Sequence, residues 1–206
     1  MRFLFLLIGC SISLCAQPSP EEALQRLISG NKRFISEQSE HPNRSSERRL
    51  ETARMQEPFA AILGCSDSRV SPEILFDQGI GDLFIVRVAG NVVSPVELAS
   101  IEFSAIYLHS ALIVVLGHEN CGAVQAVLDG NTKDIEPIAN LIQPAVDAVG
   151  PGGKDRVKRT IQKNVTLMVE QLKQNPALQE LIEQKQLRIV GGYYNFHTGK
   201  VEFLQT

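Results

Sequence analysis

The chain has 206 residues, of which 44% are hydrophobic and 21% are charged, and its formal net charge is −3 at pH 7. This composition is typical of a soluble globular protein and argues against intrinsic disorder. At a typical ~150 residues per domain, the length predicts a single domain. Because the net charge is negative and no long basic run occurs, we expect no nucleic-acid partner. The sequence has no run of 18 apolar residues, so we expect no typical membrane-spanning helix.

The first 16 residues have the features of a secretory signal peptide. Arg2 gives a positive start, an apolar stretch follows, and small residues precede a polar segment. This predicts export to a bacterial periplasm, with residues 17–206 as one catalytic domain. Two alternatives stay open. The residues around Cys10 resemble a lipoprotein signal, which would place a lipid anchor on that cysteine, and an uncleaved start would leave the protein in the cytoplasm.

The apolar patterns along the chain predict an α/β fold with a mainly parallel central sheet flanked by helices. Helices are expected where apolar residues recur at helical spacing, and strands where short apolar runs lie between turn residues. The first expected helix begins at Ser19–Pro20, and the other expected helices span residues 46–56, 95–108, 122–128, 135–149 and 157–172. The expected strands span residues 59–63, 83–88, 111–116, 187–194 and 200–204.

The first helix is well defined at its start. Ser19 and Glu22 have the spacing of a capping box, and Pro20 suits the first turn. The helix carries one apolar stripe that must pack on another surface. The stripe consists of Leu24, Leu27, Ile28 and Phe34.

Two of the expected strands end in reactive residues. The first leads into Cys65, Asp67 and Arg69, and another leads into His118 and Cys121. Ligands bind beyond the carboxyl ends of parallel strands, so these side chains are expected to meet. Two thiolates and one imidazole are the ligands of a zinc ion with an open fourth position, and such an ion lowers the pKa of bound water to about 7.

Asp67 and Arg69 can support that chemistry. A forked ion pair with Arg69 would keep Asp67 ionised and oriented. Asp67 could then accept a hydrogen bond from the zinc hydroxide and direct its oxygen toward a substrate. The residues alone leave other interpretations open: a disulfide or two buried thiols at Cys65 and Cys121, a closed structural zinc with Asp67 as fourth ligand, or a surface ion pair.

The two motifs together resemble the paired signature of the β-class carbonic anhydrases. "CSDSRV" is followed by "HENCGA", and the resemblance extends through "FDQGIGDLFIVRVAGN" and "LIVVLGH" over most of the chain from about residue 20. It implies reversible hydration of carbon dioxide to bicarbonate and a proton by zinc-bound hydroxide. It also implies one zinc per subunit on Cys65, His118 and Cys121, Asp67 and Arg69 as the catalytic pair, and a homodimer or homotetramer.

The resemblance carries over to further positions of a small substrate pocket. Gln56 matches a substrate-side glutamine contributed across the dimer interface, Phe84 an aromatic wall, and Gly122 the backbone amide after the second cysteine. Ala89 stands where many members have valine, and Phe103 where many have tyrosine.

The resemblance also implies two structural features. In some members the aspartate closes the site by replacing water on zinc, and Asp67 could do the same if Arg69 released it. The glutamine at position 56 resembles that of members whose site stays open, which favours water on zinc at neutral pH. The apolar stripe of the first helix could pack on its own subunit, but the resemblance favours an N-terminal arm whose stripe embraces a partner subunit.

Two rival functions are a carbon disulfide or carbonyl sulfide hydrolase on the same scaffold, and a non-catalytic zinc-binding or redox protein. Outside the motifs, His41, His109 and His197 are expected to be solvated surface residues. Arg87 is expected to satisfy a buried carboxylate or carbonyl.

Overall fold

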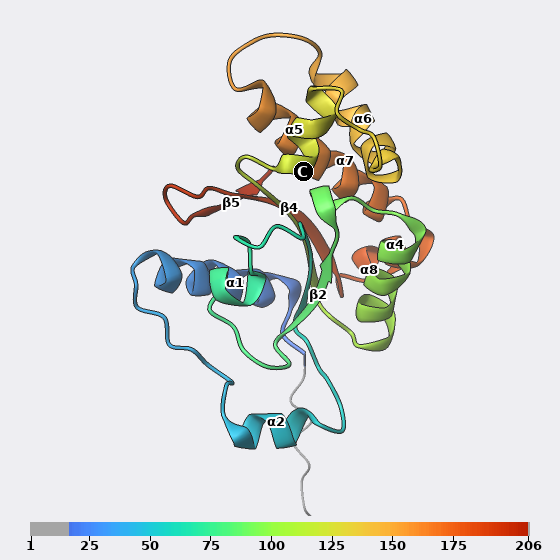
Figure 1. Ribbon diagram of the computed structural model, residues 1–206. Coiled ribbons are helices and arrows are strands. Elements are labelled where there is room, and N and C mark those ends of the chain that lie inside the picture. Colours follow the sequence, from blue (N-terminus) through green and yellow to red (C-terminus); the bar gives the residue numbers. More distant parts are fainter. Residues whose placement is uncertain (1–16, 206) are drawn as a thin grey trace, which may run out of the picture.

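A computed structural model describes residues 17–205 of the chain (Figure 1). The expected signal segment, and with it Cys10, lies outside the described residues. Within residues 17–205, none of the helices combines the length and the apolar character needed to cross a membrane.

Five strands form one sheet in the order β2–β1–β3–β4–β5. The first four strands in this order run parallel, and β5 pairs antiparallel with β4. The predicted α/β fold with a mainly parallel sheet and a closing hairpin is therefore confirmed. The strands are β1 (Ala60–Gly64), β2 (Leu83–Arg87), β3 (Leu112–His118), β4 (Arg188–Tyr194) and β5 (Val201–Leu204).

Helices cover both faces of the sheet, and most of them match the predicted ranges. They are α1 (Pro20–Ile35), α2 (Ser46–Thr52), α3 (Pro72–Leu75), α4 (Pro95–Glu102), α5 (Gly122–Leu128), α6 (Glu136–Val149), α7 (Arg156–Lys173) and α8 (Pro176–Glu183), with short turns η1 (Ala89–Asn91) and η2 (Phe103–Tyr107).

Four helical segments differ from the prediction. The helix expected over 46–56 ends at Thr52, and the crossover expected over 95–108 changes at Phe103 from an α-helix into a π-helical turn. The single turn of α3 and the eight residues of α8 were not predicted, because such short elements carry little periodicity. Asn175 nevertheless caps α8 by accepting hydrogen bonds from two backbone N–H groups.

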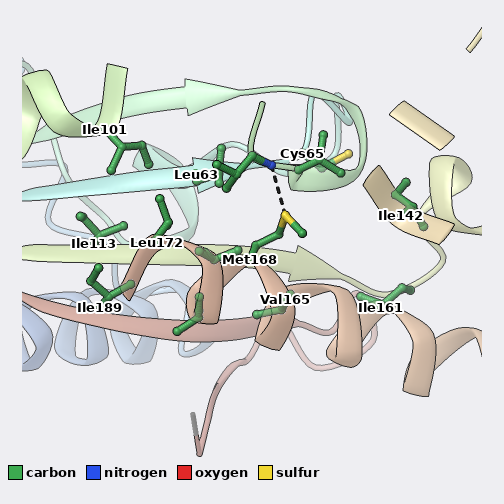
Figure 2. Close-up of a cluster of buried hydrophobic side chains, with 14 of the residues drawn as sticks. Leu63, Cys65, Ile101, Ile113, Ile142, Ile161, Val165, Met168, Leu172 and Ile189 are labelled. Atoms are coloured by element: carbon green, nitrogen blue, oxygen red, sulfur yellow. Dashed lines mark hydrogen bonds between the residues drawn. The ribbon is translucent and has the colours of Figure 1, made fainter. Parts of the chain in front are cut away.

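The sheet separates two hydrophobic clusters, because successive strand residues point to opposite faces. On one face Leu63 and Ile113 pack with Val165 and Leu172 of α7. Figure 2 shows this cluster, with Cys65 at the same end of it as Ile142 of α6. Because the central strands are buried on both faces, they read as continuous apolar runs in the sequence.

The other face of the sheet is covered by α1, which Figure 1 shows on the opposite side from α7 and α8. The predicted capping box of Ser19 and Glu22 is present. Leu24 and Leu27 are buried against Ile62 of the same chain. The expectation that this stripe embraces a partner subunit is therefore wrong for its buried members, since the sheet of their own chain already covers them.

Candidate metal centre

The three residues predicted as metal ligands come together at the carboxyl edge of the sheet. Cys65 directly follows β1, His118 is the last residue of β3, and Cys121 directly precedes α5. Because β1 and β3 are adjacent and parallel, their ends bring Cys65 and His118 together. One ligand atom from each of the three residues lies within 4.8 Å of the other two, and all three residues are buried.

The two thiols of this cluster are free and buried. A hydrogen bond from Cys121 lowers the pKa of the Cys65 thiol against the opposing effect of burial, and the same contact raises the pKa of Cys121. The backbone N–H of Gly90 also donates to Cys65 Sγ over 3.3 Å. The site thus already favours a thiolate at Cys65, as metal ligation requires.

His118 offers an unpaired nitrogen to the cluster. Its Nδ1 lies 2.8 Å from the carbonyl oxygen of Glu119, which can only accept, so Nδ1 carries the proton. Its Nε2 is buried and has no hydrogen-bond partner among the described residues. A buried polar atom left without a partner is costly, and a metal ion at this point would satisfy it.

Asp67 and Arg69 form the predicted forked pair beside the cluster. Asp67 Oδ1 accepts from the backbone N–H and Nε of Arg69, both over 2.9 Å, and Oδ2 accepts from Nη2 over 2.6 Å. These bonds hold the pKa of Asp67 well below its usual range. Asp67 Oδ2 also lies 3.8 Å from His118 Nε2, so the carboxylate borders the position that a metal would occupy.

Arg87 fixes the loop that carries Cys65 and Asp67. Its Nε donates to the carbonyl oxygen of Cys65 over 2.9 Å, and its Nη2 donates to that of Asp67 over 2.6 Å. The prediction that Arg87 satisfies a buried carboxylate or carbonyl is confirmed. By binding two carbonyls of one short loop, it limits the movement of both functional residues.

Sequence reasoning missed the support behind Cys65. Gly90 has φ +75°, and a Cβ there would lie 2.7 Å from Ile142 Cδ1, so any larger residue would be strained. The buried Asn164 of α7 donates to the carbonyl oxygen of Gly90 over 2.9 Å. A signal for Asn164 exists, because it is a polar residue on a helix face otherwise formed by Ile161 and Met168.

The contacts of the turn after β4 were also missed. Glu119 Oε2 accepts from the backbone N–H of Phe196 and lies 3.0 Å from Nδ1 of His197. His197 is 79% exposed, as predicted, but it is paired with this carboxylate. His41 and His109 are exposed, as predicted. The turn is thus tied to the segment between two of the candidate ligands.

The predicted pocket residues divide into two groups. Ala89 lies in η1 next to Gly90, and Gly122 begins α5 next to Cys121, so both border the cluster. A Cβ added at Gly122 would meet no atom within 4 Å, so the space beside it is open. These two positions can line a small pocket in the same chain.

Phe84, Phe103 and Gln56 lie elsewhere. Phe84 and Phe103 pack with ring centroids 6.3 Å apart and line a shallow hollow on the outer edge of the sheet. Phe84 pairs with Ala61 of β1, and Ala61 lies four residues before Cys65. At the rise of a strand, these four residues place Phe84 roughly 13 Å from the cluster, measured along β1. Gln56 is exposed and precedes the amino end of β1, whereas Cys65 follows the carboxyl end of the same strand.

Known proteins resemble this chain in sequence and in structure. A family model described as "Carbonic anhydrase" matches residues 60–201. A carbonic anhydrase of Mycolicibacterium smegmatis is 38% identical over 192 residues, covering 89% of this chain and 93% of that protein. The solved β-carbonic anhydrase CafA of Aspergillus fumigatus has a TM-score of 0.72 at 27% identity, covering 88% of this chain and 90% of that chain. The solved tetrameric β-carbonic anhydrases of Sordaria macrospora share the fold, with a TM-score of 0.71 at 24% identity and coverage of 90% and 98%.

Proposed function

The chain belongs to the β-class carbonic anhydrase family, and we propose that Cys65, His118 and Cys121 hold one zinc ion per subunit. The protein is a carbonic anhydrase, a lyase that catalyses the reversible hydration of carbon dioxide to bicarbonate and a proton. The observation that carries the zinc assignment is the meeting of three buried ligand atoms within 4.8 Å beside the Asp67–Arg69 pair.

The residues fit zinc by their chemistry. Two thiols and one imidazole form a donor set that zinc prefers, and three protein ligands leave a fourth position open. The unpaired Nε2 of His118 is the nitrogen available for this role. When bound, zinc supplies Lewis-acid chemistry that makes water a nucleophile at neutral pH.

We assign the orientation of the nucleophile to Asp67. Arg69 occupies Oδ1 with two hydrogen bonds and Oδ2 with one, so Oδ2 keeps acceptor capacity near His118 Nε2. Asp67 would accept a hydrogen bond from the attacking water there and direct the oxygen lone pair toward carbon dioxide. Ala89 and Gly122 would border the small substrate, which is linear and apolar.

We further propose that the enzyme works as a homodimer or homotetramer. Gln56, Phe84 and Phe103 lie away from the cluster of their own chain, and the face that carries the two phenylalanines is exposed. Val96 and Tyr107 of the same face are 72% and 71% exposed. Across a symmetric interface, these residues would reach the site of a partner subunit. The tetrameric relatives of Sordaria macrospora support an assembly of this kind.

We propose, as a separate point, that residues 1–16 direct export and that the enzyme acts in a bacterial periplasm. The support is the positive start, the apolar stretch and the small residues that precede residue 17. Intact mass measurement of the protein from a periplasmic extract tests this. A mature start near residue 17 supports the proposal, whereas full-length protein in the cytoplasm or a lipid on Cys10 contradicts it.

Stopped-flow measurement of carbon dioxide hydration, with zinc determined on the same sample, tests the zinc assignment and the activity together. We expect rapid hydration at about one zinc per chain, lost on chelation and regained when zinc is added. One zinc per chain without hydration from neutral to alkaline pH would contradict the proposed role of the site.

A further inference from the structure

We propose that Phe196, in the turn between β4 and β5, is a positioning residue that holds Arg69 on Asp67 and thereby keeps Asp67 off the metal. This inference rests on the proposed function and concerns a residue outside both sequence motifs. Its basis is that one aromatic ring contacts a candidate ligand and the catalytic pair at once.

The ring of Phe196 lies between two functional side chains. Arg69 Cζ lies 4.4 Å from the centroid of the ring, within the range of a cation–π contact. The His118 ring meets Phe196 edge-on, with centroids 5.6 Å apart and an interplanar angle of 62°. Phe196 therefore links the position of the guanidinium group to that of the imidazole.

The ring itself is held from several sides. The backbone N–H of Phe196 donates to Glu119 Oε2 over 3.0 Å, and the N–H of Glu119 donates to the carbonyl oxygen of Tyr194 over 2.8 Å. The Tyr194 ring packs edge-on against Phe196, with centroids 5.3 Å apart. These contacts fix the turn to the segment between His118 and Cys121, so the ring is a rigid support.

Arg69 needs such a support. Its side chain is 55% exposed, and all of its side-chain hydrogen bonds within residues 17–205 go to Asp67. An exposed ion pair by itself contributes little, because solvent competes for both partners. If Arg69 swings away, Asp67 Oδ2, which lies 3.8 Å from His118 Nε2, is close enough to take the open metal position. The contact with Phe196 opposes that exchange.

A matched pair of substitutions tests the proposal. Phe196→Leu removes the aromatic face but keeps an apolar side chain, and Phe203→Leu makes the same change in β5 of the same hairpin. Phe203 packs with the hydrophobic cluster under α1, and none of its ring contacts involves Arg69 or His118 within the described residues. Both variants are prepared as zinc-loaded and as cobalt-loaded holoenzyme.

Two quantities are measured. The first is kcat/KM for carbon dioxide hydration by the zinc enzyme. The second is the apparent Kd of azide, followed by the visible absorption of the cobalt enzyme, because azide reports whether the fourth metal position is open. For Phe196→Leu we expect kcat/KM to fall about fivefold and the azide Kd to rise about fivefold. For Phe203→Leu we expect both values to stay at those of the wild type.

The outcomes separate this inference from the proposed function. Wild-type values of both quantities in Phe196→Leu, or equal losses in the two Leu variants, would overturn the positioning role. Phe196→Tyr keeps the aromatic face and should restore both quantities. If Phe196→Leu does not fold, Phe196→Met serves in its place. An inactive wild-type enzyme would refute the proposed function alone, because the azide titration still tests whether Phe196 keeps the metal position open.

Discussion

At the scale of single residues, the carboxylate of Asp67 has two alternative uses. With Arg69 bound, it is an oriented acceptor beside the candidate ligands, and without Arg69 it would lie near enough to His118 Nε2 to serve as a fourth metal ligand. Three hydrogen bonds run from Arg69 to Asp67, and they hold the carboxylate in the first of these two uses. Under the proposed mechanism, Asp67 would therefore stay close to the metal without binding it.

The first prediction concerns the charge of Asp67. Asp67→Asn should keep about one zinc per chain and lower kcat/KM by about 100-fold or more. The reason is that an amide cannot accept a hydrogen bond from the attacking water and orient that water as a carboxylate does. Stopped-flow hydration and metal analysis check this. The control is Asp129→Asn, which changes an exposed carboxylate bound by Gln125 and should leave both quantities unchanged. Full activity of Asp67→Asn would remove Asp67 from the mechanism.

The second prediction concerns a metal ligand. Cys121→Ala should lower the bound zinc from about one per chain to a small fraction, because one of the three protein ligands is gone. Activity should fall in proportion to the zinc. Metal analysis after dialysis decides the question, and an unchanged zinc content would show that Cys121 is not a ligand.

At the scale of elements, a buried polar contact joins α1 to distant parts of the chain. Asp77, which follows α3, is fully buried in its side chain and accepts from Arg33 Nε over 2.6 Å and from the backbone N–H groups of Glu40 and His41. One carboxylate thus ties α1 to two separate loops.

The third prediction follows from the pKa of this group. Burial alone would raise the pKa of Asp77, but its hydrogen bonds from Arg33, Glu40 and His41 lower it below its usual value. Ionised Asp77 therefore stabilises the folded state fully above about pH 5, and this contribution is lost as the pH falls below about 4. Asp77→Asn should lower the free energy of unfolding by about 1–3 kcal/mol at pH 7 and by less at pH 3. Denaturant unfolding at the two pH values checks this, and a difference that grows at pH 3 would contradict it.

At the scale of the whole molecule, the exposed aromatic face on β2 and η2 is the surface that a partner subunit would cover. Phe103 is 45% exposed and packs against Tyr107, with ring centroids 5.5 Å apart. Exposed apolar patches of this kind mark interaction sites in soluble proteins.

The fourth prediction tests this surface. Phe103→Asp should lower the mass of the assembly measured by sedimentation and reduce activity at least about tenfold, because each site would lose the residues of its partner. Asn131→Asp, on an exposed loop after α5, adds the same charge and should change neither quantity. An unchanged assembly in Phe103→Asp would place the interface elsewhere.

The sheet and the chemistry of the site can be predicted from the order of residues along the chain. The continuous apolar runs of β1 and β3 predicted buried parallel strands, and the rule that strand ends carry ligands placed Cys65 near His118. The residue types at Asp67 and Arg69 predicted their forked pair. The strands and the Asp67–Arg69 pair are local in sequence, and the meeting of Cys65 and His118 follows from the order of the strands. The amino-acid sequence is therefore enough to predict all three.

Which distant surfaces meet, in contrast, becomes known only from the packed fold. The apolar stripe of α1 could pack on its own sheet or on a partner, and only the fold placed Leu27 against the same chain. Asn164 supports Gly90 from 74 residues away, and Phe196 meets Arg69 from a distant hairpin. Periodicity specifies which face of an element is apolar but not which distant residue it contacts, because such contacts form only when all elements pack together.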